Sequence, residues 1–496
     1  MIAALLAFAL SFVVALALES QPPSLRSLRA PPSALFLRLL VHLVIFASAF
    51  SLSWRPFHAA FVSVATAFLF GAGSAMKARI LGEPVVFSDF ALVKLAIRHP
   101  RLYYAEKLGE PRALGVFAAI AVATVVWFAL EPSILPPGGW ALLLLPPLVC
   151  AAAVWALRSP AASRAATALV GERPDLDADV ARFGLGATMT LHWLAWRRQE
   201  RPSAAARDAI ASAPVLRAGH GPDVVIAIQC ESFVDIAARG VPGPDLPAYR
   251  GLARESVGWG RCRVPAEGAY TMRAEFGFLT AIPLHAVGFD VFDPYITARA
   301  YAGASIARRM KDAGRETLFV HPYDRRFFAR DELTPDLGFD RFIDQSAFSS
   351  ADRFGPYVGD AAVAEAILKE VEAARKPLFV FAVTIENHGP WGRGRLPGID
   401  DPAAQYARHL ENSDGMMGRI AEALRARPGG GTLCVYGDHA PARTILPGMP
   451  DRCAADYLIW DAKAASALAG QRPPNERRDM NVDEVGRRLL EHLSLR

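Results

Sequence analysis

Cysteine is scarce in this sequence, and so are extended runs of positive charge. It has five cysteines in 496 residues, so we expect at most one disulfide and favour none, and no pairing can be read from the spacing. No run of Lys or Arg and no stripe of aromatic and basic residues is of the kind that binds nucleic acid, and the net charge of +5 is small for this length. These features argue against a nucleic-acid partner. The sequence also lacks an internal repeat.

Charge is scarce at the start of the chain as well, where apolar runs dominate as far as residue 157. A helix needs roughly 20 apolar residues to cross a bilayer, with some tolerance. Five runs meet this requirement, at residues 2–18, 35–52, 57–75, 113–130 and 140–157. The first run lacks the basic segment with which a secretory signal peptide begins, so we interpret it as a retained anchor. The sequence therefore predicts an α-helical membrane domain over residues 1–157 with about five spans.

The next segment, residues 158–221, is rich in Ala, Arg and Pro and is predicted to be a linker. Within it, residues 183–198 carry Trp193 and Trp196, which are followed by two arginines. Aromatic side chains beside basic ones are typical of a helix that lies in the membrane interface. A linker helix packed against the following domain would show the same pattern, so both interpretations stay open.

Basic residues beside the apolar runs bear on orientation. Arg26 and Arg29 follow the first run, and residues 77–112 hold seven Lys and Arg against four acidic residues. Loops rich in Lys and Arg tend to stay in the cytoplasm. With five spans, this rule would place both loops, and with them the C-terminal part of the chain, in the cytoplasm.

From residue 222 to residue 496, short β-branched and aromatic runs alternate with helical patterns. Strands are predicted at residues 223–229, 317–321, 377–384, 432–436 and 456–460, with helices between them such as 360–375 and 403–427. This alternation predicts a mainly parallel sheet with helices on both faces. In such sheets, functional sites lie beyond the carboxyl ends of the strands.

Metal-binding residue types stand at three of these predicted strand ends. The first strand leads into Glu231, the third into His388, and the fourth into Asp438 and His439. Each has an ordinary interpretation on its own, such as an acid near a helix start, but together they indicate a metal site. Thr271 opens an apparent helix, whose N-terminus can donate backbone N–H groups to a phosphate. It is either a helix cap or a nucleophile.

Several short motifs together resemble the lipoteichoic acid synthase and phosphoglycerol transferase family, which belongs to the alkaline phosphatase/sulfatase superfamily. They are Cys230–Ser232, Thr271–Phe276, Phe328–Glu332, Asn387–Pro390 and Tyr436–Pro441. The resemblance runs from about Val224 to the C-terminus, and residues 82–89 resemble a membrane-region stretch of the family. It implies an α/β alkaline-phosphatase/sulfatase-like domain over residues 222–496. Thr271–Phe276 is closer to the Gram-negative branch, which decorates periplasmic glucans, than to the Gram-positive polymerases.

The resemblance also implies the roles of individual residues. It assigns Thr271 as the nucleophile and as one ligand of a single divalent ion, which Glu231, Asp438 and His439 would also bind. Mn²⁺ is the usual ion of the family, and Mg²⁺ or Zn²⁺ are alternatives. The phosphoglycerol group would be bound by His321, Phe328, Arg330 and His388, and His388 would also assist proton transfer. Many family members have Trp where this chain has Phe328, so an indole N–H contact is lost here.

The expected activity is transfer of a phosphoglycerol group from a phosphatidylglycerol-like lipid to a glycan or lipid acceptor through a phospho-threonine. The enzyme would lie in the inner membrane of a bacterium with its catalytic domain outside the cytoplasm, against the charge rule. A sulfatase is not expected, because Cys262–Pro265 does not match the motif that those enzymes convert to formylglycine. Phosphoethanolamine transfer and phosphodiester hydrolysis stay open as alternatives. A non-catalytic membrane sensor is a further one, although the predicted ligand set is complete.

Overall fold

The computed structural model describes residues 2–19, 32–99, 111–219, 221–468 and 477–495. These residues divide into two compact units, one made of residues 1–79 and 83–200 and the other of residues 80–82 and 201–496. Arg26 and Arg29 lie outside the described residues. The limits predicted above, at residues 157 and 221, stay a prediction. All five cysteines are free thiols.

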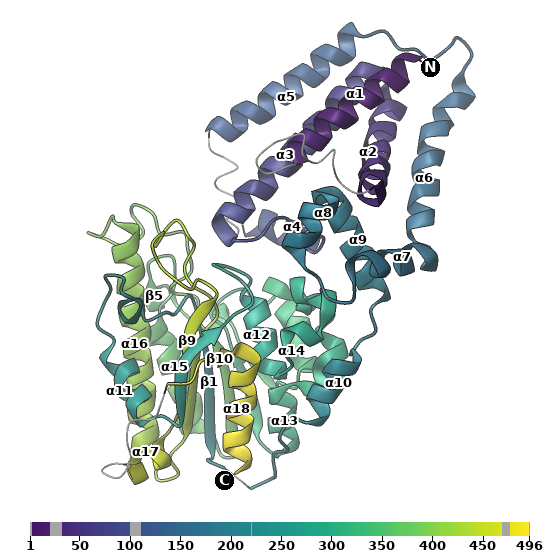
Figure 1. Cartoon of the computed structure of the whole chain (residues 1–496). Coiled ribbons are helices and arrows are strands. Elements are labelled where there is room, and N and C mark those ends of the chain that lie inside the picture. Colours follow the sequence, from purple (N-terminus) through teal and green to yellow (C-terminus); the bar gives the residue numbers. More distant parts are fainter. Residues whose placement is uncertain (1, 20–31, 100–110, 220, 469–476, 496) are drawn as a thin grey trace. The chain divides into compact units, whose positions relative to one another are not determined.

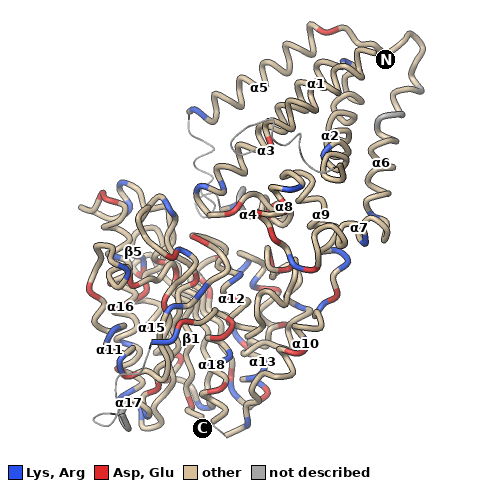
Figure 2. The backbone as a smooth tube through the Cα atoms, in the orientation of Figure 1, with Lys and Arg blue, Asp and Glu red and all other residues tan. Residues whose placement is uncertain are grey.

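The first unit is helical in every described element. Its helices are α1 (Ile2–Glu19), α2 (Pro32–Ser53), α3 (Pro56–Leu81), α4 (Asp89–Arg98), α5 (Pro111–Leu130), α6 (Leu145–Leu157), α7 (Pro160–Val170), α8 (Leu176–Phe183) and α9 (Leu185–Arg198). Helices α1, α2, α3 and α5 are long and apolar enough to cross a membrane. Figure 2 shows few charged residues along them, whereas both signs of charge occur throughout the second unit. The prediction of a membrane domain with about five spans is confirmed, since the described residues hold four to five candidate spans.

The fifth predicted span is the irregular one. A 3-10 turn at Trp140–Leu144 precedes α6, which has only 13 residues and has proline at its start. The segment Leu142–Leu157 is long and apolar enough to cross a membrane only when it is joined to α7. The axes of these two helical segments differ by 65° across the break at Ser159. Proline is tolerated in the first turn of a helix, where the backbone N–H has no partner to lose.

Helices also form inside the segment predicted to be a linker. The expected helix over residues 183–198 forms as α9 from Leu185 onward, because Gly184, with φ of 80°, ends α8 after Phe183. Helix α9 buries one face, including Leu191 and Leu194, and belongs to the helical unit. On α9, the Arg197 guanidinium stacks on the Trp193 ring at 4.8 Å from its centroid.

The second unit is built on an eight-stranded sheet in the order β10-β2-β9-β8-β1-β7-β3-β4. Its strands are β1 (Val224–Cys230), β2 (Gly258–Arg263), β3 (Glu316–Val320), β4 (Arg341–Ile343), β7 (Leu378–Val383), β8 (Thr432–Gly437), β9 (Ala454–Asp461) and β10 (Met480–Asn481). A separate hairpin pairs β5 (Arg353–Phe354) with β6 (Tyr357–Val358). Neighbouring strands β8, β1, β7, β3 and β4 are mutually parallel, and β9 runs antiparallel to β8 and β2. The predicted mainly parallel sheet is confirmed.

Helices cover both faces of this sheet (Figure 1). One face carries α11 (Pro247–Glu255), α15 (Asp360–Ala373) and α16 (Pro402–Ala426), and the other carries α12 (Thr271–Thr280), α13 (Ile306–Asp312) and α18 (Val482–Ser494). The remaining helices are α10 (Ala204–Ala211), α14 (Arg330–Asp336) and α17 (Ala462–Leu468). Every residue of β1, β7, β8 and β9 is buried. This explains why these strands read as continuous apolar runs rather than as alternating patterns.

Candidate active site

Four neighbouring parallel strands carry five of the eight predicted site residues at one edge of the sheet. Strand β1 ends one residue before Glu231, β8 ends one residue before Asp438, β3 ends one residue before His321, and His388 follows β7. The strands lie side by side in the order β8-β1-β7-β3 and point the same way. Their carboxyl ends therefore gather residues that are up to about two hundred positions apart in the chain, as the position of sites in parallel sheets leads one to expect.

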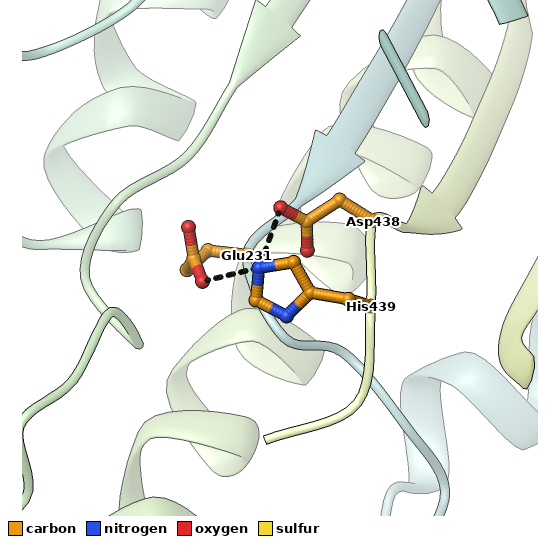
Figure 3. Close-up of side chains that lie close together, drawn as sticks. All are labelled: Glu231, Asp438 and His439. Carbon is orange, nitrogen blue, oxygen red and sulfur yellow. Dashed lines mark ion pairs between the residues drawn. The ribbon is translucent and has the colours of Figure 1, made fainter. Parts of the chain in front are cut away.

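The side chains of Glu231, Asp438 and His439 converge (Figure 3). All three residues are buried, and one ligand atom of each lies within 4.8 Å of the other two. His439 Nε2 is 3.6 Å from Glu231 Oε1 and 3.3 Å from Asp438 Oδ2. Ligand atoms that share one ion at about 2.0–2.3 Å are separated by roughly 3–4 Å, so these distances fit a common divalent ion.

The hydrogen bonds around these three residues leave suitable atoms open for a cation. The Ser232 backbone N–H donates to Asp438 Oδ1 at 2.8 Å, whereas Asp438 Oδ2 is buried and has no hydrogen-bond partner among the described residues. The Ser232 hydroxyl donates to Glu231 Oε1 at 2.8 Å. Burial, and after it the nearby Asp438 carboxylate, raise the pKa of Glu231 well above its usual range. A buried pair of carboxylates with an orphaned oxygen is what a divalent cation would neutralise.

Two local backbone features hold the ligands in place. A Cβ atom added to Gly437 would lie 2.2 Å from the Phe233 carbonyl oxygen, so only glycine fits directly before Asp438. Ser232, directly after Glu231, has φ of 52° although it is not glycine. Tyr406 donates its hydroxyl to the Ser232 carbonyl at 2.7 Å and fixes this bend from α16.

Thr271 is the first residue of α12 and is half-buried, whereas all nine residues that follow it in the helix are buried. The N-cap position is held by Tyr270, with no side-chain capping bond, so Thr271 is not the helix cap. The Gln229 side chain donates to the Thr271 carbonyl at 3.4 Å and accepts from the Tyr436 hydroxyl at 2.6 Å. These bonds attach the start of α12 to β1 and β8, two residues before Glu231 and Asp438. Ligation by the Thr271 hydroxyl stays a prediction.

In three histidines of the site, Nδ1 lies within hydrogen-bond distance of a backbone carbonyl. Because a carbonyl oxygen can only accept, Nδ1 of each ring carries the proton and donates it. The pairs are His321 with Val383 at 3.0 Å, His388 with Gly389 at 2.8 Å and His439 with Ala440 at 2.9 Å. The neutral ring then carries its lone pair on Nε2, as metal-binding and proton-accepting imidazoles require. Burial lowers the pKa of His388 to about 4 and, ahead of the nearby Arg330 cation, lowers the pKa of His321 well below its usual range.

Arg330, the first residue of α14, is 1% exposed and is paired with the fully buried Glu275 of α12. Its Nη2 donates to Glu275 Oε2 at 2.6 Å and its Nε donates to Oε1 at 3.2 Å. Tyr295 also donates its hydroxyl to Glu275. Although burial alone disfavours the cation, the Glu275 carboxylate raises the pKa of Arg330 above its ordinary value. Phe328 is half-buried beside this group, with the Arg330 guanidinium 5.2 Å from its ring centroid.

Residues in left-handed backbone conformations stand next to each part of the site. They are Ser232 after Glu231, Tyr270 before Thr271, and Phe328 with Ala329 before Arg330, with φ between 52° and 63°. For residues other than glycine, such conformations cost of order 1–3 kcal/mol each and persist where the surroundings impose them. Their concentration here indicates that the backbone is shaped by the site rather than by local preference.

Comparison with known proteins agrees with this architecture. The family model described as Sulfatase matches residues 224–494. The capsular polysaccharide biosynthesis protein RkpI of Rhizobium meliloti (strain 1021) is 31% identical over 473 residues, which cover 92% of this chain and 87% of that protein. A second protein of that strain, named for the modification of cyclic β-1,2-glucan, is 26% identical over 266 residues, 48% of this chain and 40% of its own length. The lipooligosaccharide phosphoethanolamine transferase EptA of Neisseria meningitidis, an integral membrane protein, has the same fold, with a TM-score of 0.58 at 14% identity over 99% of this chain and 95% of its own.

Proposed function

We propose that this chain, which belongs to the family whose model is described as Sulfatase, is a membrane phosphotransferase rather than a sulfatase by activity. It would carry a phosphoglycerol group from a phosphatidylglycerol-like lipid to a glycan or lipid acceptor. The observation that carries the proposal is the buried group of Glu231, Asp438 and His439, two residues beyond the strand position where Gln229 donates to the Thr271 carbonyl. We place the protein in the inner membrane of a bacterium, with its second unit outside the cytoplasm.

The three buried ligands, together with the Thr271 hydroxyl, would hold one divalent ion. Such an ion supplies Lewis-acid stabilisation of the charge that develops on the phosphoryl oxygens and on the nucleophile. Mn²⁺ is our first candidate, since two carboxylates and one imidazole suit it, and Mg²⁺ and Zn²⁺ are the alternatives. His439 is already oriented for this task, because its Nδ1–H is held by the Ala440 carbonyl and its Nε2 faces both carboxylates.

The reaction proceeds in two successive displacements at the phosphorus atom, and one proton is transferred from the attacking to the leaving oxygen in each. In the first, Thr271 Oγ1 bonds to the phosphorus, the bond from phosphorus to the diacylglycerol oxygen breaks, and the threonine proton ends on the released diacylglycerol. In the second, an acceptor hydroxyl attacks the phosphorus, the bond to Thr271 breaks, and the acceptor proton returns to the threonine oxygen. We assign the relay of these protons to His388, which is neutral and carries its lone pair on Nε2.

The polar atoms beside the phosphate position support a headgroup with hydroxyls. His321 Nε2 is buried without a hydrogen-bond partner among the described residues and can only accept a bond. It therefore needs a donor on the ligand, which a glycerol hydroxyl or an ammonium would supply. We propose phosphoglycerol over phosphoethanolamine, because its hydroxyls supply this donor without bringing a further charge into a buried site.

The acceptor is proposed to be a glycan. The two curated relatives support this choice, since one is named for capsular polysaccharide biosynthesis and the other for modification of cyclic β-1,2-glucan. A lipid acceptor would be reached by the same second displacement, because any hydroxyl that enters opposite Thr271 completes it.

The purified full chain with Mn²⁺ tests the proposal on liposomes that contain either phosphatidylglycerol or phosphatidylethanolamine. We expect release of diacylglycerol from phosphatidylglycerol, loss of release after chelation with EDTA, and its return when Mn²⁺ is added back. Asp438→Asn, which removes one ligand oxygen, is the inactive control. Added glucan should become labelled from headgroup-labelled lipid.

Three results would redirect or end the proposal. Faster release from phosphatidylethanolamine would make the chain a phosphoethanolamine transferase. Free glycerophosphate with no labelled acceptor would make it a phosphodiesterase. A folded protein that binds Mn²⁺ and releases diacylglycerol from neither lipid would exclude the reaction.

A further inference from the structure

The buried carboxylate of Glu275 lies in the site, yet it neither belongs to the ligand group nor follows a strand. It is one helical turn after Thr271, and positions four apart share one face of a helix. The nucleophile and Glu275 therefore project from the same side of α12. Because nine of the ten residues of this helix are buried, its position relative to the sheet is fixed by packing.

Glu275 binds two of the three guanidinium nitrogens of Arg330 and leaves the third without a partner among the described residues. The bonds from Nε and Nη2 occupy one edge of the guanidinium, and the third nitrogen, Nη1, is buried with no hydrogen-bond partner among the described residues. A buried guanidinium N–H without an acceptor lowers the stability of the folded state. Such a cost is accepted where the donor serves a ligand, and an anionic oxygen is the natural partner of an arginine N–H.

Tyr295 sets the position of Glu275 from a third element. Its hydroxyl donates to Glu275 Oε1, the oxygen that also accepts from Arg330 Nε. Its ring meets the edge of Phe328, with centroids 6.4 Å apart. Glu275 thus receives donors from Tyr295, in the short turn Pro294–Ile296, and from Arg330 at the start of α14. The Glu275 carboxylate and the Phe328 ring both contact the Arg330 guanidinium and thus restrict its rotation.

From these contacts we propose that Glu275 and Tyr295 are positioning residues, which hold Arg330 edge-on so that Nη1 is presented to an oxygen of the phosphoryl group that Thr271 attacks. The inference rests on the proposed function for the identity of that group. Removing one partner of a buried ion pair also destabilises the fold, so the experiments below must separate positioning of Arg330 from a role in stability alone. A misplacement of about 1 Å at a reacting centre can cost about 100-fold in rate.

Glu275→Gln is the principal variant, since it keeps the shape of the side chain and removes its charge. With the purified full chain and Mn²⁺, we expect kcat for diacylglycerol release to fall about 100-fold, with a smaller change in KM. Tyr295→Phe removes one hydroxyl and should give about a tenfold loss. In an Arg330→Met background, Glu275→Gln should add no further loss, because both variants remove the same contribution.

Binding of inorganic phosphate to the Mn²⁺-loaded protein separates this inference from the proposed function, since it needs no lipid turnover. We expect Glu275→Gln to weaken phosphate binding about tenfold, for one charged hydrogen bond displaced, and to leave Mn²⁺ affinity unchanged. Asp456→Asn is the matched control: it breaks another buried ion pair of this unit, to Arg239 at 3.1 Å, and should leave phosphate affinity as in the wild type.

The inference is overturned if Glu275→Gln and Tyr295→Phe both bind phosphate as tightly as the wild type. It is also overturned if the loss from Glu275→Gln is undiminished in the Arg330→Met background, which would indicate a general loss of folded protein. Should Glu275→Gln not fold, Tyr295→Phe decides by the same two measurements. A wild type that binds phosphate but releases no diacylglycerol would reject the proposed lipid reaction and leave the phosphate comparison intact.

Discussion

Thr271 can be tested as a nucleophile with little interference from stability, because Tyr270 rather than Thr271 occupies the N-cap of α12. Thr271→Ala removes the attacking oxygen and keeps a residue that favours helix. We expect turnover to fall by at least about 1,000-fold, since the remaining groups have nothing to attack with. The unfolding temperature should stay close to that of the wild type. The measurement is release of diacylglycerol beside thermal unfolding of the same preparations.

Thr271→Ser is the matched control, because it retains a hydroxyl and loses only a methyl group. It should keep measurable turnover and should carry glycerophosphate on the peptide that contains position 271 after reaction with labelled lipid. The alanine variant should carry none. Near-normal turnover of Thr271→Ala would show that the covalent step does not pass through this residue.

Side chains at the site differ in how far the sequence alone could predict them. Glu231, His388 and Asp438 follow apolar strands that were recognisable as such, and their place at one edge follows from the parallel sheet. Glu275 lies within the Thr271–Phe276 motif but was assigned no role, since a carboxylate inside a helix does not reveal that its partner comes from α14. The left-handed residues were likewise unpredictable, because Tyr270, Phe328 and Ala329 are not glycine.

Strands and helices of the second unit were predicted where burial is complete and missed where it is not. The five predicted strands correspond to β1, β3, β7, β8 and β9. Strand β2 was missed: its sequence Gly258–Arg263 carries two glycines and two arginines, and it forms because β9 and β10 pair with its two edges. The direction of β9 was not predictable either, since an apolar run carries no information on whether its neighbour is parallel.

In helix α18, burial changes the pKa of one acidic side chain, and this change can be measured as a pH dependence of stability. It begins with a capping box between Asn481 and Glu484, and Asp483 in its first turn is 5% exposed. Burial raises the pKa of Asp483 to about 6. The folded state therefore binds a proton that the unfolded state releases near pH 4, so this residue's contribution to stability is lost as the pH rises from about 4 to about 6.

Asp483→Asn should remove that pH dependence, because asparagine stays neutral. Relative to the wild type, we expect the variant to gain stability on the order of 2 kcal/mol between pH 4 and pH 7, with the difference appearing inside that window. Thermal unfolding of both proteins at steps of pH measures it. Parallel pH profiles would show that Asp483 ionises in the folded protein as it does in the unfolded chain.

The membrane orientation of the complete chain depends on how many helices cross. Basic residues before α5 favour the cytoplasm for residues 77–112. If α6 crosses as a fifth span, the catalytic unit then lies in the cytoplasm with them. If only α1, α2, α3 and α5 cross, the same charges place everything after Leu130 outside. The short, bent α6 thus offers a way to reconcile the charge rule with a catalytic unit outside the cytoplasm.

Reporter fusions at two positions separate these arrangements. One reporter folds only outside the cytoplasm and the other only inside, and each is fused after Gly139, between α5 and α6, and after Arg496. We expect the outside reporter to be active after Arg496, because the lipid and glycan substrates that we propose meet on that side. An outside result at Gly139 as well would mean four spans and agreement with the loop charges. An inside result at Gly139 would mean five spans, with residues 77–112 outside despite their charge. Activity of the inside reporter after Arg496 would reject the proposed orientation, because the catalytic unit would then face cytoplasmic lipid and no exported glycan.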